Sequence, residues 1–413
     1  MKTKVDVLVI GAGPSGTIAA SILKKAGLDV VIVEKTTFPR FVIGESLLPR
    51  CMEALEEAGF LNALKDAKFQ EKSGAKFVMS DKTICDFNFN EKHSSGYEWT
   101  WQVPRADFDK ILADECGKMN IPIYYESEVV HIQFHDDESS DIDIKLKDGT
   151  IHKISAKFII DGSGYGRVIP RMFGLEKESN LAPRRALFTH YIDKNRNKIK
   201  AEEPDRITIY VYDTTTWVWC IPFSNGNTSV GFVGFPDFFE KFNSTPTENL
   251  KAMIASHEEL NEQFGDCEMI FEPRELKSWS ATTDKFYGKG FVLTGNVTEF
   301  LDPMFSSGVT LASVSAQKAA HLVIDKLNNK PVDWEKDYME PCMQGVNVFR
   351  TFVNEWYSGD LHTIFFSKNQ NEEIRRQISS VLAGYVWDKS NPFVNNHEKQ
   401  VKSLAKYIRD TQA

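Results

Sequence analysis

The residues best placed to do chemistry form a glycine-rich turn near the start of the chain. Gly11, Gly13 and Gly16 have the spacing Gly-x-Gly-x-x-Gly, and Glu34 follows at the end of the next apolar run. In a dinucleotide site, the first glycine makes a tight turn, the second lets the backbone approach a pyrophosphate, and the third lets a helix pack on the sheet. Glu34 would accept hydrogen bonds from an adenosine ribose.

The residues around this turn predict the elements that position it. Strand formers occupy residues 5–10, a segment with helical spacing follows the turn, and Val30-Val31-Ile32-Val33 supplies a second strand that ends on the acid. The order strand, turn, helix, strand is that of a βαβ unit. Because all of these features agree, the sequence favours a dinucleotide site over an ordinary glycine turn.

The composition excludes several other classes of protein. The chain has 413 residues, 42% hydrophobic and 26% charged, which suits two or three domains with a substantial core. A formal charge of −9 without a basic block argues against nucleic acid as a partner. The six cysteines contain no C-x-x-C pair, so we expect reduced thiols, no disulfide framework and no metal site. The chain has no apolar run of about 18 residues and leaves no room for a leader before its first strand, which predicts a cytoplasmic protein without a transmembrane segment.

The remaining patterns predict an α/β fold with an α+β insert. Residues 1–180 carry the first part of a Rossmann-type domain, with a β-meander and an excursion at about 76–104. Residues 181–286 hold aromatic-rich strands of an antiparallel sheet, the natural place for a substrate. Residues 287–330 return to the first domain as a buried strand and a helix, and residues 331–413 form a C-terminal helical region.

Two further segments are suited to the ring end of a dinucleotide. Gly44-Glu45-Ser46 combines a glycine that permits close backbone approach with a serine suited to cap a helix. Ser306-Ser307-Gly308 opens a long helix, whose free N–H groups bind an anion or a ring carbonyl. Asn296 and Asp302 flank the returning strand, and we expect both to contact the bound group. Taken alone, a Gly-Glu-Ser segment is also typical of an ordinary helix cap.

In this order, the motifs resemble the FAD-dependent monooxygenase and reductase superfamily with a glutathione-reductase-type Rossmann domain. Trp217-Val218-Trp219-Cys220-Ile221-Pro222 is similar to the W-x-W-x-I-P signature of flavin-dependent halogenases. Phe300-x-x-Pro303-x-x-Ser306-x-Gly308 is similar to their second signature. Lys72-Ser73-Gly74-Ala75-Lys76-Phe77 resembles the context of a lysine in the phenol and pyrrole halogenases. The resemblance covers essentially the whole chain.

The resemblance implies an FAD-dependent halogenase. FADH2 from a separate flavin reductase would react with O2, and halide held at Ser307 and Gly308 would become hypohalous acid. Lys72 would direct this acid to a phenolic or pyrrolic substrate, free or tethered to a carrier protein, while Trp217 and Trp219 separate flavin from substrate. The residues implied for FAD binding are Gly11, Gly13, Pro14, Ser15, Gly16, Glu34, Lys35, Arg40, Gly44, Glu45, Ser46, Arg105, Val129, Asp161, Gly162, Gly295, Asn296, Pro303, Ser307, Gly308 and Val309.

Two departures and several alternatives stay open at this point. Asn296 stands where the family has Asp, although an amide can also hydrogen-bond a flavin hydroxyl. Phe305 stands where tryptophan halogenases have a catalytic Glu, which points away from free tryptophan as substrate. The other candidate functions are an aromatic hydroxylase or a geranylgeranyl-reductase-type reductase using NADPH, and a non-catalytic FAD-binding redox sensor. The alternative for Lys72 is an ordinary surface lysine. The alternative for Trp217 and Trp219 is a purely structural place in the hydrophobic core.

Overall fold

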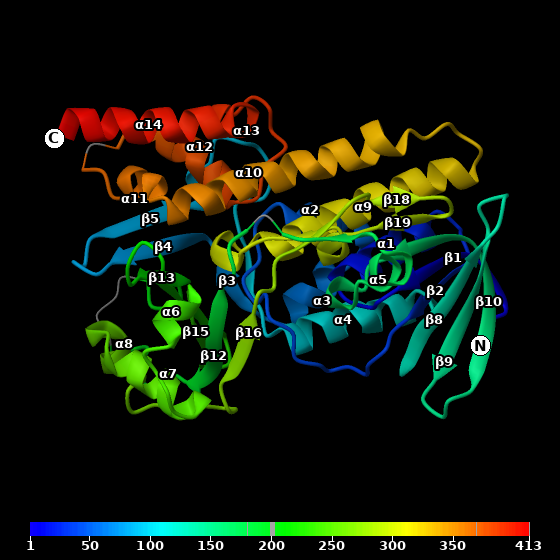
Figure 1. Cartoon of the computed structure of the whole chain (residues 1–413), viewed down its shortest axis with the longest axis horizontal. Helices are drawn as coiled ribbons and strands as arrows, with labels where there is room; N and C mark the ends of the chain where they lie inside the picture. The colour runs from blue at the N-terminus through cyan, green and yellow to red at the C-terminus, as the bar shows by residue number, and fades with distance from the viewer. Residues whose placement is uncertain (180, 199–202, 369, 413) are drawn as a thin grey trace.

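The computed structural model describes residues 1–179, 181–198, 203–368 and 370–412. The expected domain ends at 180 and 413 therefore lie outside the described residues. Two β-sheets organise the fold, one at each end of the molecule, and long helices run along the top of the view between them (Figure 1).

The first sheet grows from the βαβ unit that the sequence predicts. β1 (Lys4–Ile10) leads through the glycine turn into α1 (Pro14–Lys25), and β2 (Val30–Val33) returns parallel to β1. On the other side of β1 lies β10 (Ile151–Asp161), and β19 (Phe291–Leu293) pairs parallel with β10 from far along the chain. The expected Rossmann-type arrangement is confirmed.

Helices cover one face of this sheet and an antiparallel strand pair covers the other. α1, α4 (Arg105–Lys118) and α9 (Ser307–Leu327) share one apolar cluster with the sheet. β8 (Ser127–Phe134) and β9 (Ser140–Leu146) form a meander with β10 and bury a second cluster against the opposite face. The carboxyl ends of β1, β2 and β10 remain free to hold a ligand.

The second sheet is mostly antiparallel and combines residues from two distant parts of the chain. Its middle strand β14 (Trp217–Pro222) is buried throughout and carries both signature tryptophans. β13 (Thr208–Val211) pairs with β14 on one side and, in parallel, with β4 (Gly74–Met79) on the other. In spatial order the strands are β16 (Arg274–Lys277), β12 (Arg185–Ile192), β15 (Asn227–Gly234), β14, β13, β4 and β5 (Ile84–Asn88).

Helices again enclose this sheet. α7 (Pro246–Ala255) and α8 (Glu258–Phe264) pack on one face around Phe232 and Phe238. The C-terminal helices share a large aromatic core with the other face, including Phe77, Trp217 and Trp356. These helices are α10 (Glu340–Tyr357), α11 (Asp360–Phe365), α12 (Glu372–Leu382), α13 (Pro392–Asn395) and α14 (His397–Gln412).

Short elements join the two parts of the molecule. β3 (Gln70–Lys72) pairs antiparallel with β6 (Thr100–Gln102) between the sheets. The other short elements are α2 (Cys51–Ala58), α3 (Leu61–Asp66), β7 (Ile123–Tyr124), α5 (Val168–Phe173), β11 (Glu176–Lys177), α6 (Pro236–Phe239), β17 (Ala281–Thr283), β18 (Tyr287–Gly288) and β20 (Glu299–Phe300). Among the described residues, we find no helix of sufficient length and apolarity to cross a membrane.

Candidate functional site

A cavity of about 390 Å³ begins at the glycine turn and extends to the second sheet. The turn itself leaves no room for side chains at two positions. Gly11 has φ +92°, and a Cβ there would lie 2.8 Å from the Gly162 carbonyl oxygen, while a Cβ on Gly16 would lie 1.9 Å from the Gly11 carbonyl oxygen. Gly13, Pro14 and Ser15 at the start of α1 line the cavity, and a helix start of this kind suits a pyrophosphate.

Glu34 and Arg40 lie beside this turn. Glu34 is 6% exposed, and its carboxylate accepts hydrogen bonds from the backbone N–H groups of Ala12 and Thr36, both at 2.9 Å. The Arg40 guanidinium lies 3.9 Å from Glu34 and 3.6 Å from Asp109. Pro14, Ser15 and Lys35 also line the cavity here. This end provides a fixed carboxylate for a ribose and a cation for a phosphate.

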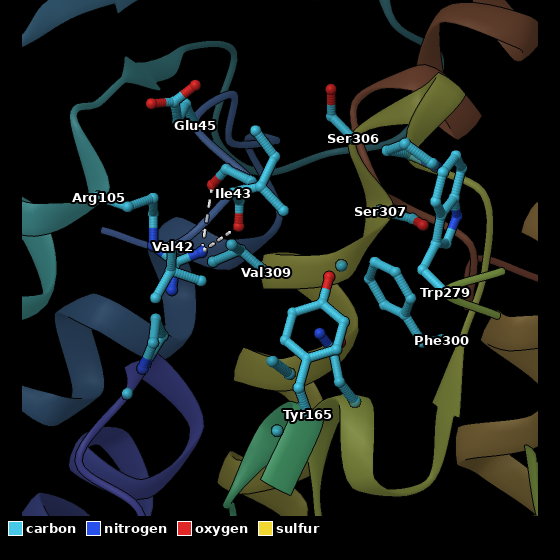
Figure 2. Close-up of a pocket in the computed structure, with 18 of the residues that line it drawn as sticks. Val42, Ile43, Glu45, Arg105, Tyr165, Trp279, Phe300, Ser306, Ser307 and Val309 are labelled. Carbon is cyan, nitrogen blue, oxygen red and sulfur yellow. Dashed lines mark hydrogen bonds between the residues drawn. The ribbon is translucent and has the colours of Figure 1, made fainter. Parts of the chain in front are cut away.

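Arg105 fixes the loop that forms one wall. It forms a bidentate ion pair with buried Asp109, with N–O distances of 2.8 and 3.0 Å. It also donates to the carbonyl oxygens of Ile43, at 3.1 Å, and Gly44, at 3.3 Å (Figure 2). Gly44 has φ +109°, a conformation that suits glycine. Arg105 is therefore buried in the site wall and is not a surface ion pair.

Removing this arginine should weaken both the fold and cofactor binding. In Arg105→Met, Asp109 would stay buried without its bidentate partner, and the 43–44 loop would lose its anchor. We expect a loss of about 3–5 kcal/mol in the free energy of unfolding, together with weaker FAD binding. Urea unfolding and fluorescence titration with FAD measure the two effects. The exposed ion-pair variant Lys110→Met should change neither by more than about 1 kcal/mol.

The wall opposite Arg105 is the turn that enters α9. Figure 2 shows Ser306, Ser307, Trp279 and Phe300 facing the Ile43 loop across the cavity, with Tyr165 between the two walls. Ser306 adopts φ +56°, and α9 begins directly after it at Ser307. The other lining residues on this wall include Asn296, Pro303, Gly308 and Val309. The N–H groups at this helix start can bind an anion.

The far end of the cavity is apolar and belongs to the second sheet. Trp217 and Trp219 line it together with residues of neighbouring strands. The Trp217 indole N–H donates to the Tyr357 hydroxyl at 2.9 Å, and that of Trp219 donates to Ser229 Oγ at 3.0 Å. The remaining apolar lining residues here are Ala186, Ile209, Ile221 and Leu276 of this sheet and Ile207 directly before β13.

Lys72 is a buried lysine behind the wall of the cavity. It is 3% exposed, and its ammonium donates to Ser46 Oγ and to the Leu47 carbonyl oxygen, both at 2.8 Å. Burial lowers the pKa of Lys72 to about 7, and Cys51 acts in the opposite direction. Ser46 lines the cavity, whereas Lys72 does not. A lysine with this pKa alternates between charged and neutral forms near neutral pH.

One local expectation is wrong. Ser46 does not cap a helix, because α2 begins only at Cys51 and the Ser46 hydroxyl instead accepts from Lys72. Its neighbour Glu45 is 1% exposed and lies 2.7 Å from His190 Nε2 on β12. The 44–46 segment therefore connects the glycine-turn domain both to the second sheet and to the buried lysine.

Other predicted cofactor residues support the site from behind. Asp161 accepts hydrogen bonds from the N–H groups of Ser163, at 3.0 Å, and Ile169, at 2.8 Å, so its carboxylate holds the start of α5. Burial raises the pKa of Asp161, against several hydrogen bonds that lower it. Val129 is buried in β8, and Gly295 packs against Ala312 of α9. Gly162 lines the cavity, whereas Asp161, Val129, Gly295 and Gly16 do not.

Several lining residues were not predicted. Tyr165 and Gly164 follow the Asp161-Gly162 motif directly, so that motif could have indicated them. Trp279 is 9% exposed and has no hydrogen-bond partner for its indole N–H among the described residues. Nothing in its local sequence marks it. The further unpredicted lining residues are the five apolar residues named above beside Trp217 and Trp219, together with Thr36, Val42, Ile43, Ser163, Gly166, Thr294, Phe300, Leu301, Met304 and Ala312.

These residues fit FAD as the bound group. The glycine turn leaves space for a pyrophosphate, Glu34 suits the ribose, and the turn at α9 offers N–H groups at the ring end. Within the described ranges, no cluster of three or more His, Cys, Asp or Glu residues could hold a metal ion.

Comparisons with known proteins agree with this arrangement. A pyrrole-2-carbonyl-carrier-protein chlorinase from Pseudomonas fluorescens is 27% identical over 98% of this chain and 97% of its own. The corresponding brominase from Pseudoalteromonas luteoviolacea is 27% identical over 93% of this chain and 92% of its own.

Solved structures extend the comparison. The crystal structure of a flavoprotein/dehydrogenase from Cytophaga hutchinsonii has a TM-score of 0.96 and 54% identity, and the alignment covers 99% of this chain and 100% of that one. The flavin-dependent brominase Bmp2 has a TM-score of 0.85 and 25% identity, with 99% of this chain and 100% of that one covered. The model of the FAD binding domain family matches residues 4–312. The chain belongs to this family and is an FAD-dependent enzyme of the oxidoreductase type.

Proposed function

We propose that the protein is a flavin-dependent halogenase acting on a pyrrolic or phenolic ring. One observation carries the proposal: the turn at Ser307, the Trp217 and Trp219 pair and the Ser46 contact of buried Lys72 all meet at one FAD cavity. The carrier-protein halogenases that resemble the chain over nearly its whole length support this choice. When bound, reduced FAD together with O2 would supply the oxidising chemistry: FADH2 and halide each give two electrons to O2, and the halide becomes hypohalous acid.

The chain's own residues have separate roles in this proposal. The N–H groups of Ser307 and Gly308 at the start of α9 hold the halide. The tryptophan pair fills the space between the flavin and the organic substrate, so that the ring does not reach the flavin. Lys72 hydrogen-bonds hypohalous acid and orients it. Because Lys72 lies behind Ser46, the Ser46–Lys72 contact has to open during turnover.

The proposal includes the partners. FADH2 comes from a separate flavin reductase. The substrate is free or attached to a carrier protein, and the names of two relatives, which include a carrier protein, support the second form. The six cysteines are free thiols in the structure, which fits a reducing, cytoplasmic location.

The decisive experiment supplies FADH2, O2 and bromide to the purified protein with a panel of pyrroles, phenols and pyrrolyl carrier thioesters. We expect a product whose mass spectrum shows the bromine isotope pair, and no such product without bromide. The second candidate function is that of a reductase or hydroxylase, because the 54% identical protein is named a flavoprotein/dehydrogenase. Rapid NADPH oxidation without added reductase, combined with unhalogenated or hydroxylated products, would establish that candidate instead.

A further inference from the structure

Trp217, Tyr357 and Asp302 form a hydrogen-bonded chain at the wall of the cavity. The Trp217 indole N–H donates to the Tyr357 hydroxyl at 2.9 Å, and this hydroxyl donates to Asp302 Oδ2 at 3.1 Å. An indole N–H can only donate, so the hydroxyl that accepts from it directs its own proton to the carboxylate. The chain is therefore oriented toward Asp302.

Asp302 itself reaches both the cavity and the turn at α9. Its Oδ1 accepts a hydrogen bond from the Met304 N–H at 3.1 Å, which fixes the turn that leads to Ser306 and Ser307. Asp302 is 3% exposed and lines the cavity. Each carboxylate oxygen keeps a second lone pair beyond these bonds, so the group can exchange a proton with the cavity.

The surroundings of Asp302 suit an acid. Burial raises its pKa to about 6, opposed by the charge of Arg184 and by the hydrogen bonds from Met304 and Tyr357. Arg184 and Tyr357 are the charged and titratable groups that act on it. The Arg184 guanidinium carbon lies 3.9 Å from the ring centroids of both Tyr357 and Phe235, which holds the cation in place. Asp302 therefore exchanges its proton near neutral pH, as general acids do.

We propose that Asp302 is a catalytic acid that donates the proton consumed in halide oxidation, and that Tyr357 is its positioning residue. This inference rests on the proposed function. In that reaction FADH2, O2, one halide ion and one proton give FAD, hypohalous acid and water. FADH2 and halide each lose two electrons to O2. The halide–oxygen bond forms as the O–O bond breaks, and the proton from Asp302 goes to the departing oxygen, which leaves as water. Solvent then reprotonates Asp302.

The inference brings α10 into the reaction. Tyr357 is the last residue of that helix, and its hydroxyl links a signature tryptophan to the acid. The C-terminal region would then set the protonation of the site in addition to completing the aromatic core.

The test compares Asp302→Asn and Tyr357→Phe with Tyr385→Phe. Tyr385 is a buried tyrosine of the same C-terminal region whose hydroxyl donates to the Tyr97 carbonyl oxygen at 3.2 Å, and it does not line the cavity. The measured quantity is the rate of hypohalous acid formation as a function of pH, with FADH2 supplied and the acid trapped by excess 1,3-diketone. FAD binding by each variant is measured in parallel by fluorescence.

We expect the wild-type rate to fall as pH rises through about 6, because the acid form is lost. Asp302→Asn should be slower by about 10²–10⁴-fold and should lack this pH dependence. Tyr357→Phe should move the midpoint to higher pH, because it removes a hydrogen bond that lowers the pKa of Asp302. Tyr385→Phe should follow the wild type.

Each contrary result has a defined meaning. An Asp302→Asn protein that binds FAD and keeps the wild-type rate and pH profile shows that Asp302 is not the acid. Identical profiles for Tyr357→Phe and Tyr385→Phe show that Tyr357 does not position it. If Asp302→Asn fails to bind FAD, the pH profile of Tyr357→Phe decides whether Asp302 is the acid: a midpoint at higher pH supports it, and an unchanged midpoint contradicts it. Failure of the wild type to make hypohalous acid at any pH overturns the halogenase function, and this inference with it.

Discussion

Lys72→Met should lower halogenation by about 10²–10⁴-fold while FAD remains bound. Methionine keeps the length and burial of the side chain but removes the ammonium that contacts Ser46 and would orient hypohalous acid. Because Lys72 lies outside the cavity that would hold the flavin, free hypohalous acid should still form. The measurement is the ratio of halogenated product to trapped hypohalous acid at saturating FADH2.

A second buried lysine provides the matched control. Lys92 has a buried ammonium that donates to the Gly96 carbonyl oxygen at 2.9 Å, and burial lowers its pKa as well. Unlike Ser46, which Lys72 contacts, Gly96 does not line the cavity, so Lys92→Met should leave the product ratio unchanged. Equal losses in both variants would mean that Lys72 acts only through stability. An unchanged product ratio in Lys72→Met would show that Lys72 does not orient hypohalous acid.

The same variant tests the ionisation of Lys72. The pKa of Lys72 is about 7 in the folded protein and about 10.4 in an unfolded chain. Between these values the unfolded chain binds more protons, so the free energy of unfolding rises with pH over this range. Below both values the penalty for burying the charge is fully present. From pH 7 to about pH 10, the free energy of unfolding of the wild type should therefore rise relative to that of Lys72→Met. Urea unfolding at several pH values measures this difference.

Gly16→Ala should abolish FAD binding and cost about 2–4 kcal/mol in the free energy of unfolding. The added Cβ would lie 1.9 Å from the Gly11 carbonyl oxygen and 3.2 Å from a Val9 side-chain carbon. Two backbone segments would have to separate, and the turn for the pyrophosphate would be lost. Calorimetric titration with FAD and urea unfolding check the two effects.

Gly117→Ala is the control for this substitution. Gly117 lies in α4, and a Cβ there would meet nothing within 4 Å. The change should keep FAD binding and raise the free energy of unfolding by about 0.5–1 kcal/mol, because alanine favours a helix. A Gly16→Ala protein that binds FAD like Gly117→Ala would contradict the role given to the glycine turn.

The sequence predicted those parts of the site that depend on neighbouring residues. The turn from Gly11 to Gly16 and the acid at Glu34 have local causes, namely backbone space and strand ends, and the fold places them as expected. Ser46 was misassigned because its partner, Lys72, is 26 residues away and a serine before a helical segment usually caps it.

Partners far apart in the chain could not be predicted. Trp217 and Tyr357 are 140 residues apart, and no local pattern connects them. Trp279 enters the cavity only because the second sheet and the α9 turn meet there. Long-range packing of this kind depends on the whole fold, so periodicity and motif spacing carry no information about it. The family resemblance indicated many residues that line the cavity, but not the contacts that support them.

The parallel pairing of β13 with β4 has a consequence for engineering. β4 and β5 end at Asn88, and the next strand of their sheet begins only at Arg185, so the second sheet is not a continuous segment that begins at residue 181. In a chimera that takes only residues 181–286 from a relative, β13 would come from the relative and β4 from this chain. The two strands would have to pair at Ile209–Phe77 and Val211–Met79 although they come from different proteins. Recombination that preserves the sheet has to exchange residues 74–88 with it, which ties the evolution of this sheet to the segment that directly follows Lys72.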